Sequence, residues 1–316
     1  MSLFPRVSGA LLAISAATLA LPANAQSRTF YLDRAQISGA PDDGFMVWRP
    51  YMDEETRFYG NLALGYAHTP LRADTVAPPD IAGDIDDPVL GQFIAYPSIG
   101  AEIARWVAFN VAMPIILYQS TGEDPGNQGF AVGNGLDASA TALSDVRLDM
   151  RVVPLENAAR TTRLGAGVAV WAATGNGGAF ASDDGTTGFF YLSAEHDFGK
   201  KFLLSAMAGP HFRPFRSIGG DDGELFISSE LRWALGGYLP LRDGRLRIGV
   251  EFWGTTGLEP DVNGDSTFGT SRNTDVEWLA QARFLFGQKK QVYANLGAGT
   301  RSPEEGGGMD TMRYPR

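Results

Sequence analysis

Histidine and cysteine, the side chains that most often bind metals or activate nucleophiles, are scarce in this chain. The sequence has no cysteine and three histidines, His68, His196 and His211. No two of the histidines have the spacing of metal ligands, so the sequence predicts no metal site. The lack of cysteine also excludes a disulfide framework and thiolate chemistry.

A serine hydrolase would need a serine nucleophile activated by a histidine. His196 falls on the apolar face of its predicted strand near a turn, which suits an interfacial residue. His211 faces the other way, but Ser205 on that face is six residues distant, about 20 Å at ~3.3 Å per residue. This strand supplies no catalytic pair, and a serine on a neighbouring strand is left open. We expect no enzyme and no cofactor.

Acidic residues gather in segments without hydrophobic periodicity. They are Asp84, Asp86, Asp87, Asp183, Asp184, Asp221, Asp222 and Glu224. Residues 261–265 read Asp-Val-Asn-Gly-Asp, but the EF-hand spacing and its distal Glu are missing. Solvated surface loops are the favoured interpretation. The alternative is that the loops bind divalent cations that bridge lipopolysaccharide phosphates.

The elements that carry these residues show the period-two alternation of β-strands. Within 107–117 every second residue is apolar: Val107, Phe109, Val111, Met113, Ile115 and Leu117. The opposite face is smaller and more mixed: Trp106, Ala108, Asn110, Ala112, Pro114 and Tyr118. A soluble strand has about 5–6 residues, whereas a tilted membrane strand needs roughly 9–11. Residues 89–120 are therefore predicted to be a membrane β-hairpin that turns near 102–105.

The alternation recurs along the chain. Further strands are predicted at 58–66, 144–152, 163–173, 190–198, 202–208, 225–239, 246–253, 276–286 and 292–298. The connections alternate between short and long, which is the rule for outer-membrane barrels with periplasmic turns and extracellular loops. About eleven strands can be counted, and an even number suggests twelve. The predicted fold class is all-β: a transmembrane antiparallel up-and-down β-barrel of about 12 strands, the last short or incomplete.

The N-terminus has the pattern of an export signal. Arg6 precedes the apolar stretch 10–21, and Ala23-Asn24-Ala25 matches a cleavage site. The apolar stretch is shorter than the ~20 residues that span a bilayer. We therefore expect a signal peptide at 1–25, a periplasmic leader at 26–50 and the barrel at 51–316, located in the cell outer membrane.

The inner face of the predicted barrel is charged. The inward positions include Asp145, Arg147, Asp149, Arg151, Glu195, Glu230, Arg232, Arg247, Glu251, Glu277 and Arg283. Charges of both signs can pair across an interior where an unpaired charge is costly, which favours a mostly occluded lumen. The predicted function is a structural protein of the cell envelope, and the alternative is a porin-like channel for small solutes.

The charge balance restricts the partners. The formal net charge is -10, which argues against nucleic acid because phosphate binding needs clustered basic side chains. Outer-membrane lipid and lipopolysaccharide are the expected partners. The oligomeric state is left open.

Several stretches resemble OmpA-family barrel proteins of myxobacteria. They are Pro-Ile-Ile-Leu-Tyr-Gln-Ser at 114–120, Phe-Tyr-Leu-Asp-Arg at 30–34 and Pro-Asp-Asp-Gly-Phe at 41–45. Such proteins commonly continue into a peptidoglycan-binding domain, for which this sequence has no counterpart, so peptidoglycan binding is not expected. Residues 309–316 show little alternation. The resemblance therefore predicts a truncated or split member whose barrel seam is weak or completed by something else.

Overall fold

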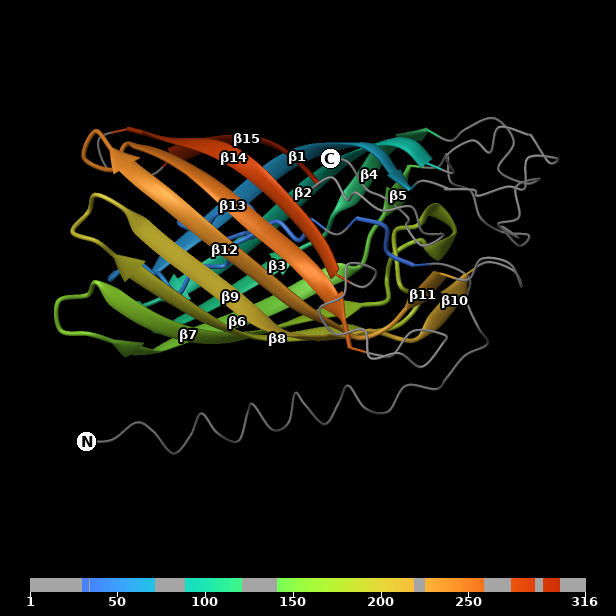
Figure 1. Cartoon of the computed structure of the whole chain (residues 1–316), viewed down its shortest axis with the longest axis horizontal. Helices are drawn as coiled ribbons and strands as arrows, with labels where there is room; N and C mark the ends of the chain where they lie inside the picture. The colour runs from blue at the N-terminus through green and yellow to red at the C-terminus, as the bar shows by residue number, and fades with distance from the viewer. Residues whose placement is uncertain are drawn as a thin grey trace.

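The computed structural model describes residues 30–33, 35–71, 89–120, 141–218, 225–258, 274–287 and 292–301. Within these ranges the strands wrap into a barrel, and the one helix is a 3-10 turn at Gly177–Ala179 (Figure 1). No helix in the described ranges is long and apolar enough to cross a membrane. The predicted all-β class is confirmed.

One antiparallel sheet forms the wall of the barrel. Its strands are β1 (Arg57–Leu71), β2 (Val89–Ile103), β3 (Val107–Ala112), β4 (Ile115–Ser120), β5 (Ala142–Leu143), β6 (Val146–Glu156), β7 (Thr162–Ala172), β8 (Thr187–Asp197), β9 (Leu203–Phe212), β12 (Glu230–Leu241), β13 (Leu246–Gly257), β14 (Thr274–Phe286) and β15 (Val292–Arg301). The small strands β10 (Arg216–Ile218) and β11 (Leu225–Ile227) pair with each other outside this sheet. Sequential neighbours pair around the wall, which confirms the up-and-down topology.

The wall is made of segments that cross it from one end to the other, called staves here. Two of these staves are each broken into two strands. β3 and β4 both pair with β2 and are separated by Met113 and Pro114, and β5 and β6 continue the next stave. A proline interrupts a ladder because it has no N–H to donate. The thirteen strands of the sheet therefore form eleven staves, with β1 and β15 at its edges. The twelfth strand expected from the sequence falls on residues outside the described ranges.

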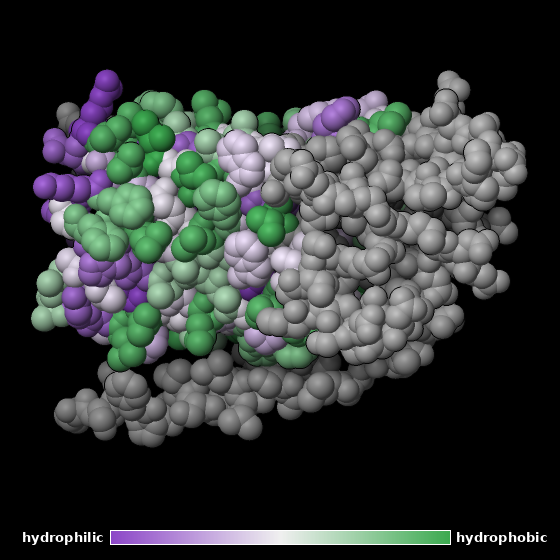
Figure 2. Space-filling view, viewed as in Figure 1, coloured by the Kyte–Doolittle hydropathy of each residue, from purple (hydrophilic) through white to green (hydrophobic). Residues whose placement is uncertain are grey.

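The outer face of the wall is apolar, as the alternation predicts. Its exposed side chains include Leu62, Phe109, Leu148, Leu164, Phe190, Leu192, Leu235, Val250, Phe252, Trp278, Phe284 and Leu296. On the face in view in Figure 2, hydrophobic residues lie over the strands and hydrophilic residues gather at the end that carries the short turns. An outer apolar band flanked by polar ends is typical of a barrel that lipid surrounds.

Two residues of the mixed face predicted for this part of the hairpin are exposed, as the apolar face is. Trp106 lies in the turn before β3 and is 46% exposed, and Tyr118 in β4 is 58% exposed. The register of β2 and β4 shifts so that Ile94 pairs with Ile116 while Phe93 pairs with Tyr118. The extra residue of this bulge reverses the facing of the side chains that follow it.

The short turns lie where the sequence places them. Positive φ angles occur at residues 104–105, 199–200 and 242–244, which connect β2 to β3, β8 to β9 and β12 to β13. Tight hairpins favour such angles because they match the twist of the flanking strands. The described connection between β7 and β8, residues 173–186, lies with β10 and β11 at the opposite end of the barrel, called the long-loop end below (Figure 1).

The N-terminal segment, residues 30–56, runs through the barrel interior. At the long-loop end Leu32 N–H donates to Phe180 O (3.0 Å), and at the short-turn end Asp53 N–H donates to Glu102 Oε2 (3.1 Å). Between these points Trp48 packs on Phe189. The sequence predicts that residues 26–50 form a periplasmic leader. The structure places their described part inside the wall, because the inner face offers partners for their polar groups.

An arginine on the outer face tests whether lipid covers it. We expect Leu235→Arg, at the middle of β12, to lower the free energy of unfolding by about 2–4 kcal/mol, because the charge would enter hydrocarbon. Urea titration of the barrel in lipid vesicles measures this change. The matched control is Leu241→Arg, an equally exposed residue beside a turn, which should cost about 0–1 kcal/mol. Equal costs at both sites would contradict the membrane placement.

Candidate functional site

All eleven charged residues predicted for the lumen lie on the inner face of the wall. Nine of them are buried, and Asp149 and Arg247 are partly exposed. The structure does not simply pair these charges with one another across the lumen. It brings several of them into contact with the N-terminal segment, whose residues 26–50 the sequence predicts to be a leader.

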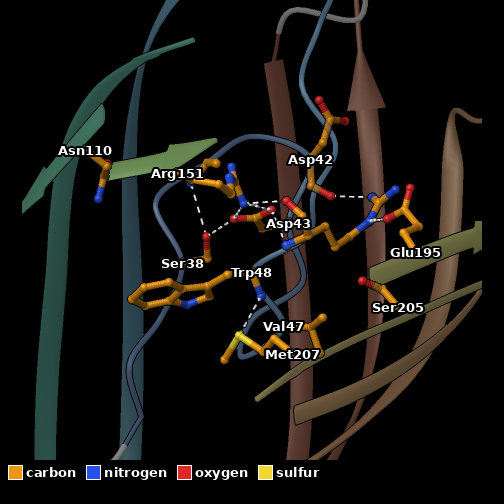
Figure 3. A network of polar contacts seen from close by, with 12 residues as sticks. Ser38, Asp42, Asp43, Val47, Trp48, Asn110, Arg151, Glu195, Ser205 and Met207 are labelled. Carbon is orange, nitrogen blue, oxygen red and sulfur yellow. Dashed lines mark hydrogen bonds and ion pairs between the residues drawn. The ribbon is translucent and has the colours of Figure 1, made fainter. Parts of the chain in front are cut away.

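Asp43 is the centre of one set of contacts, drawn in Figure 3. Its carboxylate accepts hydrogen bonds from Arg151 Nη1 (2.8 and 3.0 Å), from the backbone N–H of Arg49 (2.8 Å) and from the hydroxyl of Ser38. Arg151 Nη1 also donates to Arg49 O (2.5 Å). Both charged side chains are at most 4% exposed. Charge-assisted hydrogen bonds of this kind offset the cost of burying the pair.

Arg49 carries a second ion pair between the segment and the wall. Its Nε donates to Glu195 Oε2 in β8 (2.6 Å), and the other oxygen of Glu195 accepts from Arg163 Nη1 in β7 (3.0 Å). Arg163 also donates to Glu156 (2.9 Å). Glu195 was predicted from the alternation of β8, whereas Arg49 and Arg163 were not.

Glu251 in β13 holds the backbone of the segment directly. Its carboxylate accepts hydrogen bonds from the N–H groups of residues 45–47 (3.0, 2.7 and 3.2 Å), and from the hydroxyl of Tyr238 (2.9 Å). Gly44 precedes these N–H groups, and a Cβ there would collide with Glu251 Oε1 and the Tyr238 hydroxyl. Only glycine allows the segment to come this close.

Arginines of the wall also bind the carbonyl groups of the same turn. Arg247 donates to Asp42 O (2.7 Å) and Asp43 O (2.6 Å), and Arg283 Nη1 donates to Asp43 O (3.2 Å). The Asp42 carboxylate pairs with Arg57 (2.5 Å).

A separate group of charged residues lies at the long-loop end. Asp183 accepts from the backbone N–H of Tyr31 (2.9 Å) and from two nitrogens of Arg213 (3.0 and 2.6 Å). The expectation of a solvated loop is therefore wrong for Asp183, which is buried, whereas the adjacent Asp184 is exposed. The other acidic loop residues named above lie outside the described ranges.

The remaining predicted residues have three kinds of contact: with the backbone between β7 and β8, with other polar side chains, and with aromatic rings. Asp145 accepts from the N–H groups of residues 174 and 175 (3.0 and 2.9 Å), and Glu230 pairs with His211 Nδ1 (3.0 Å). Arg147 donates to Asp149 (3.1 Å) and lies over the Trp48 ring. Arg232 lies over the ring of Phe189, and Glu277 is buried on β14.

His196 and His211 each contact side chains of a neighbouring strand. His211 meets Glu230, while the Ser205 hydroxyl donates to Ala194 O (3.3 Å). His196 contacts the Thr162 hydroxyl (2.8 Å) and the Phe198 ring. Within the described ranges no three His, Asp or Glu side chains come together as metal ligands.

The space around the N-terminal segment is uneven. Small cavities of about 10, 20 and 10 Å³ are lined by residues such as Ser38 and Arg147, Gln36 and His211, and Asp43 and Asp149. Each has room for about one water molecule. A larger cavity of about 730 Å³ lies between the segment and the strands β1 and β15. The described segment therefore fills part of the lumen and leaves a cavity beside β1 and β15.

Comparison with known proteins gives a structural match alone. No protein-family model and no curated protein matches the chain. The structure is similar to the COG4313 outer membrane channel from Pseudomonas putida F1, with a TM-score of 0.54 and 13% identity over 83% of this chain and 89% of that chain. The deltaS2S3 mutant of TodX, a monoaromatic hydrocarbon channel, gives a TM-score of 0.39 and 11% identity over 80% of this chain and 77% of that chain. The first likeness shows that the two chains share a barrel fold.

Replacing Glu251 tests whether the wall holds the segment. In Glu251→Ala the N–H groups of residues 45–47 lose their acceptor. We expect their hydrogen exchange to accelerate by about tenfold or more, since exchange follows local opening. Hydrogen–deuterium exchange of the detergent-solubilised barrel measures this rate. The control Glu156→Ala removes a glutamate that binds Arg160 and Arg163, and should leave residues 45–47 protected. Unchanged exchange in Glu251→Ala would reject the contact.

Proposed function

We propose that this protein is an outer-membrane channel for small solutes whose lumen is closed by residues 30–56. The observation that carries the proposal is the passage of this segment through the barrel, fixed to the wall by Asp43, Arg49 and the backbone at 45–47. The likeness to a channel barrel supports this function over the purely structural role favoured by the sequence.

The chemistry of the contacts favours a segment that can be displaced. Many of its attachments are ion pairs and hydrogen bonds to Arg151, Glu195 and Glu251. Water can replace such partners, since a charge that is solvated carries no burial cost. If the segment moved, the charged groups of the wall would hydrate, and aromatic side chains such as Phe189 and Trp253 would line the lumen beside them. A barrel of this size lies between eight-stranded barrels filled by side chains and the open porins with sixteen to eighteen strands.

The finer expectations from the sequence belong to this proposal. They are cleavage of residues 1–25, insertion into the outer membrane among lipid and lipopolysaccharide, and kinship with OmpA-family barrels. Catalysis has no part in it. The short turns are assigned to the periplasmic side by the connection-length rule.

Planar-bilayer recording tests the closed state. We expect the native barrel to show small or rare currents, and a variant lacking residues 30–50 to show stable currents about tenfold larger or more, because a polar lumen of this size then opens to water. The matched control is Glu55→Ala, an exposed residue at the end of the same segment, which should conduct as the native chain does.

Folding must be established before these currents are compared. Both variants should remain heat-modifiable on gels, as intact barrels are. A folded deletion variant that conducts no better than the native barrel would reject the proposed closure. Large stable currents in the native barrel would also contradict it.

A further inference from the structure

Two neighbouring turns at the short-turn end share a group of exposed basic side chains, called the basic patch here: Lys200, Lys201, Arg242 and Arg245. The two lysines lie in the turn between β8 and β9, and the two arginines lie in the turn between β12 and β13. These turns are adjacent because β9 pairs with β12 as far as Leu203 and Tyr238. Figure 1 shows both turns at the same end of the barrel.

The basic patch differs from the cations at the neighbouring turns, which already have partners. Arg160, between β6 and β7, forms ion pairs with Glu54 and Glu156. Arg105, between β2 and β3, lies over the ring of Trp106, 5.1 Å from its centroid. In the described part of the chain, no ion pair includes a residue of the basic patch. Its charges are therefore available to a partner.

The two turns carry more positive than negative charge. Beside the four basic residues stand two acidic ones, Asp197 and Asp243. The Asp197 carboxylate accepts the backbone N–H of Lys200 (2.5 Å), so it is in part engaged with the turn itself. The formal net charge of the whole chain is -10. The basic patch is therefore a local excess of positive charge on an acidic protein, and an anion can balance it.

Apolar side chains lie directly beside the basic patch on the outer face of the wall. Phe198 and Phe202 are exposed, and their ring centroids are 5.8 Å apart. A Cβ on Gly237 would lie 3.3 Å from the Phe202 ring, so this ring lies against the backbone of β12. Leu241, just before Arg242, is exposed as well. Aromatic residues mark the membrane interface, where basic side chains reach the headgroups.

A partner that fits this surface is anionic at one end and apolar at the other. Nucleic acid or an acidic peptide would meet the cations but would leave the exposed rings without an apolar partner. A phospholipid whose headgroup has a net negative charge meets both, because its phosphate and its acyl chains lie at the two depths concerned. Basic residues near a membrane surface attract such lipids. A zwitterionic headgroup carries its own cation and gains less from the patch.

We propose that the basic patch is a binding site for an anionic phospholipid in the leaflet next to the short turns. The headgroup phosphate binds between the two turns, and the acyl chains lie along Phe202 and the apolar wall. The inference depends on the placement of the barrel in a membrane and goes beyond the channel function, on which it does not rest.

Titration of the native chain with two lipids measures the selectivity of the site. The detergent-solubilised barrel is titrated with phosphatidylglycerol or with phosphatidylcholine of the same acyl chains, and native mass spectrometry counts the bound lipids. We expect the first phosphatidylglycerol to bind about tenfold or more tightly, because each basic residue near a membrane surface gives roughly a fivefold preference for anionic lipid. Equal binding of the two lipids would overturn the proposal, whatever the variants show.

A pair of double variants locates the binding. Lys200→Asn with Arg242→Asn removes one cation from each turn of the basic patch. Both residues have positive φ angles, 62° and 52°, which asparagine tolerates. We expect phosphatidylglycerol binding to weaken about tenfold. The matched control is Arg105→Asn with Arg160→Asn, which removes two cations from positive φ angles of 62° and 58° at the same end. It should bind phosphatidylglycerol as the native chain does.

Equal loss of binding in both double variants would show that the overall charge alone matters, and would overturn the site. Competition by glycerol 3-phosphate at the concentration of the lipid would also overturn it, because that anion has no acyl chains. Heat modifiability verifies that each variant has folded. Since the basic patch lies outside the lumen, both double variants should conduct as the native barrel does. Loss of lipid binding alone therefore leaves the channel function intact, and an absent current leaves the lipid site intact.

Discussion

The structure depends on the need to pair charges that the barrel wall turns inward. Strand alternation gives the inner face Arg151, Glu195, Glu251 and Arg283, each of them buried. A buried charge without a partner costs several kcal/mol, and a lumen of this width is too wide for all of these side chains to meet. The turn at residues 42–44 and Arg49 supply the missing partners. The wall and the N-terminal segment are therefore incomplete without each other.

This constraint explains why the segment lies where it does. Glu251 accepts three consecutive backbone N–H groups of a chain that has no strand partner there, which satisfies groups that would otherwise be buried and unpaired. Trp48, packed against Phe189, adds an apolar contact at the centre. The segment is therefore held both by polar contacts and by an apolar cluster that includes Met46 and Val47.

The sequence predicted the wall much better than its contents. Residues such as Leu148 and Arg151 could be assigned to opposite faces because side chains alternate strictly along a strand. The same rule failed at Tyr118, where a bulge shifts the register. The N-terminal segment has no periodicity, so its polar composition indicated a leader. Its one signal was the apolar group at residues 46–48 beside Arg49. Long-range pairs such as Arg49 with Glu195 have no pattern in the local sequence. The sequence therefore predicted the wall residues of the site but not their partners on the N-terminal segment.

The most direct test of the central claim is a disulfide between the segment and the wall. The chain has no cysteine, so Pro50→Cys with Gly165→Cys gives a single possible pair. A Cβ on Gly165 would lie 2.8 Å from that of Pro50, and a shift of about 1 Å would reach the usual ~3.8 Å separation of a disulfide. The account predicts that the folded barrel forms this bond on mild oxidation, seen as faster migration of the boiled, unreduced chain. If no bond forms and a bulky maleimide labels both cysteines in the folded barrel, the segment does not occupy the lumen.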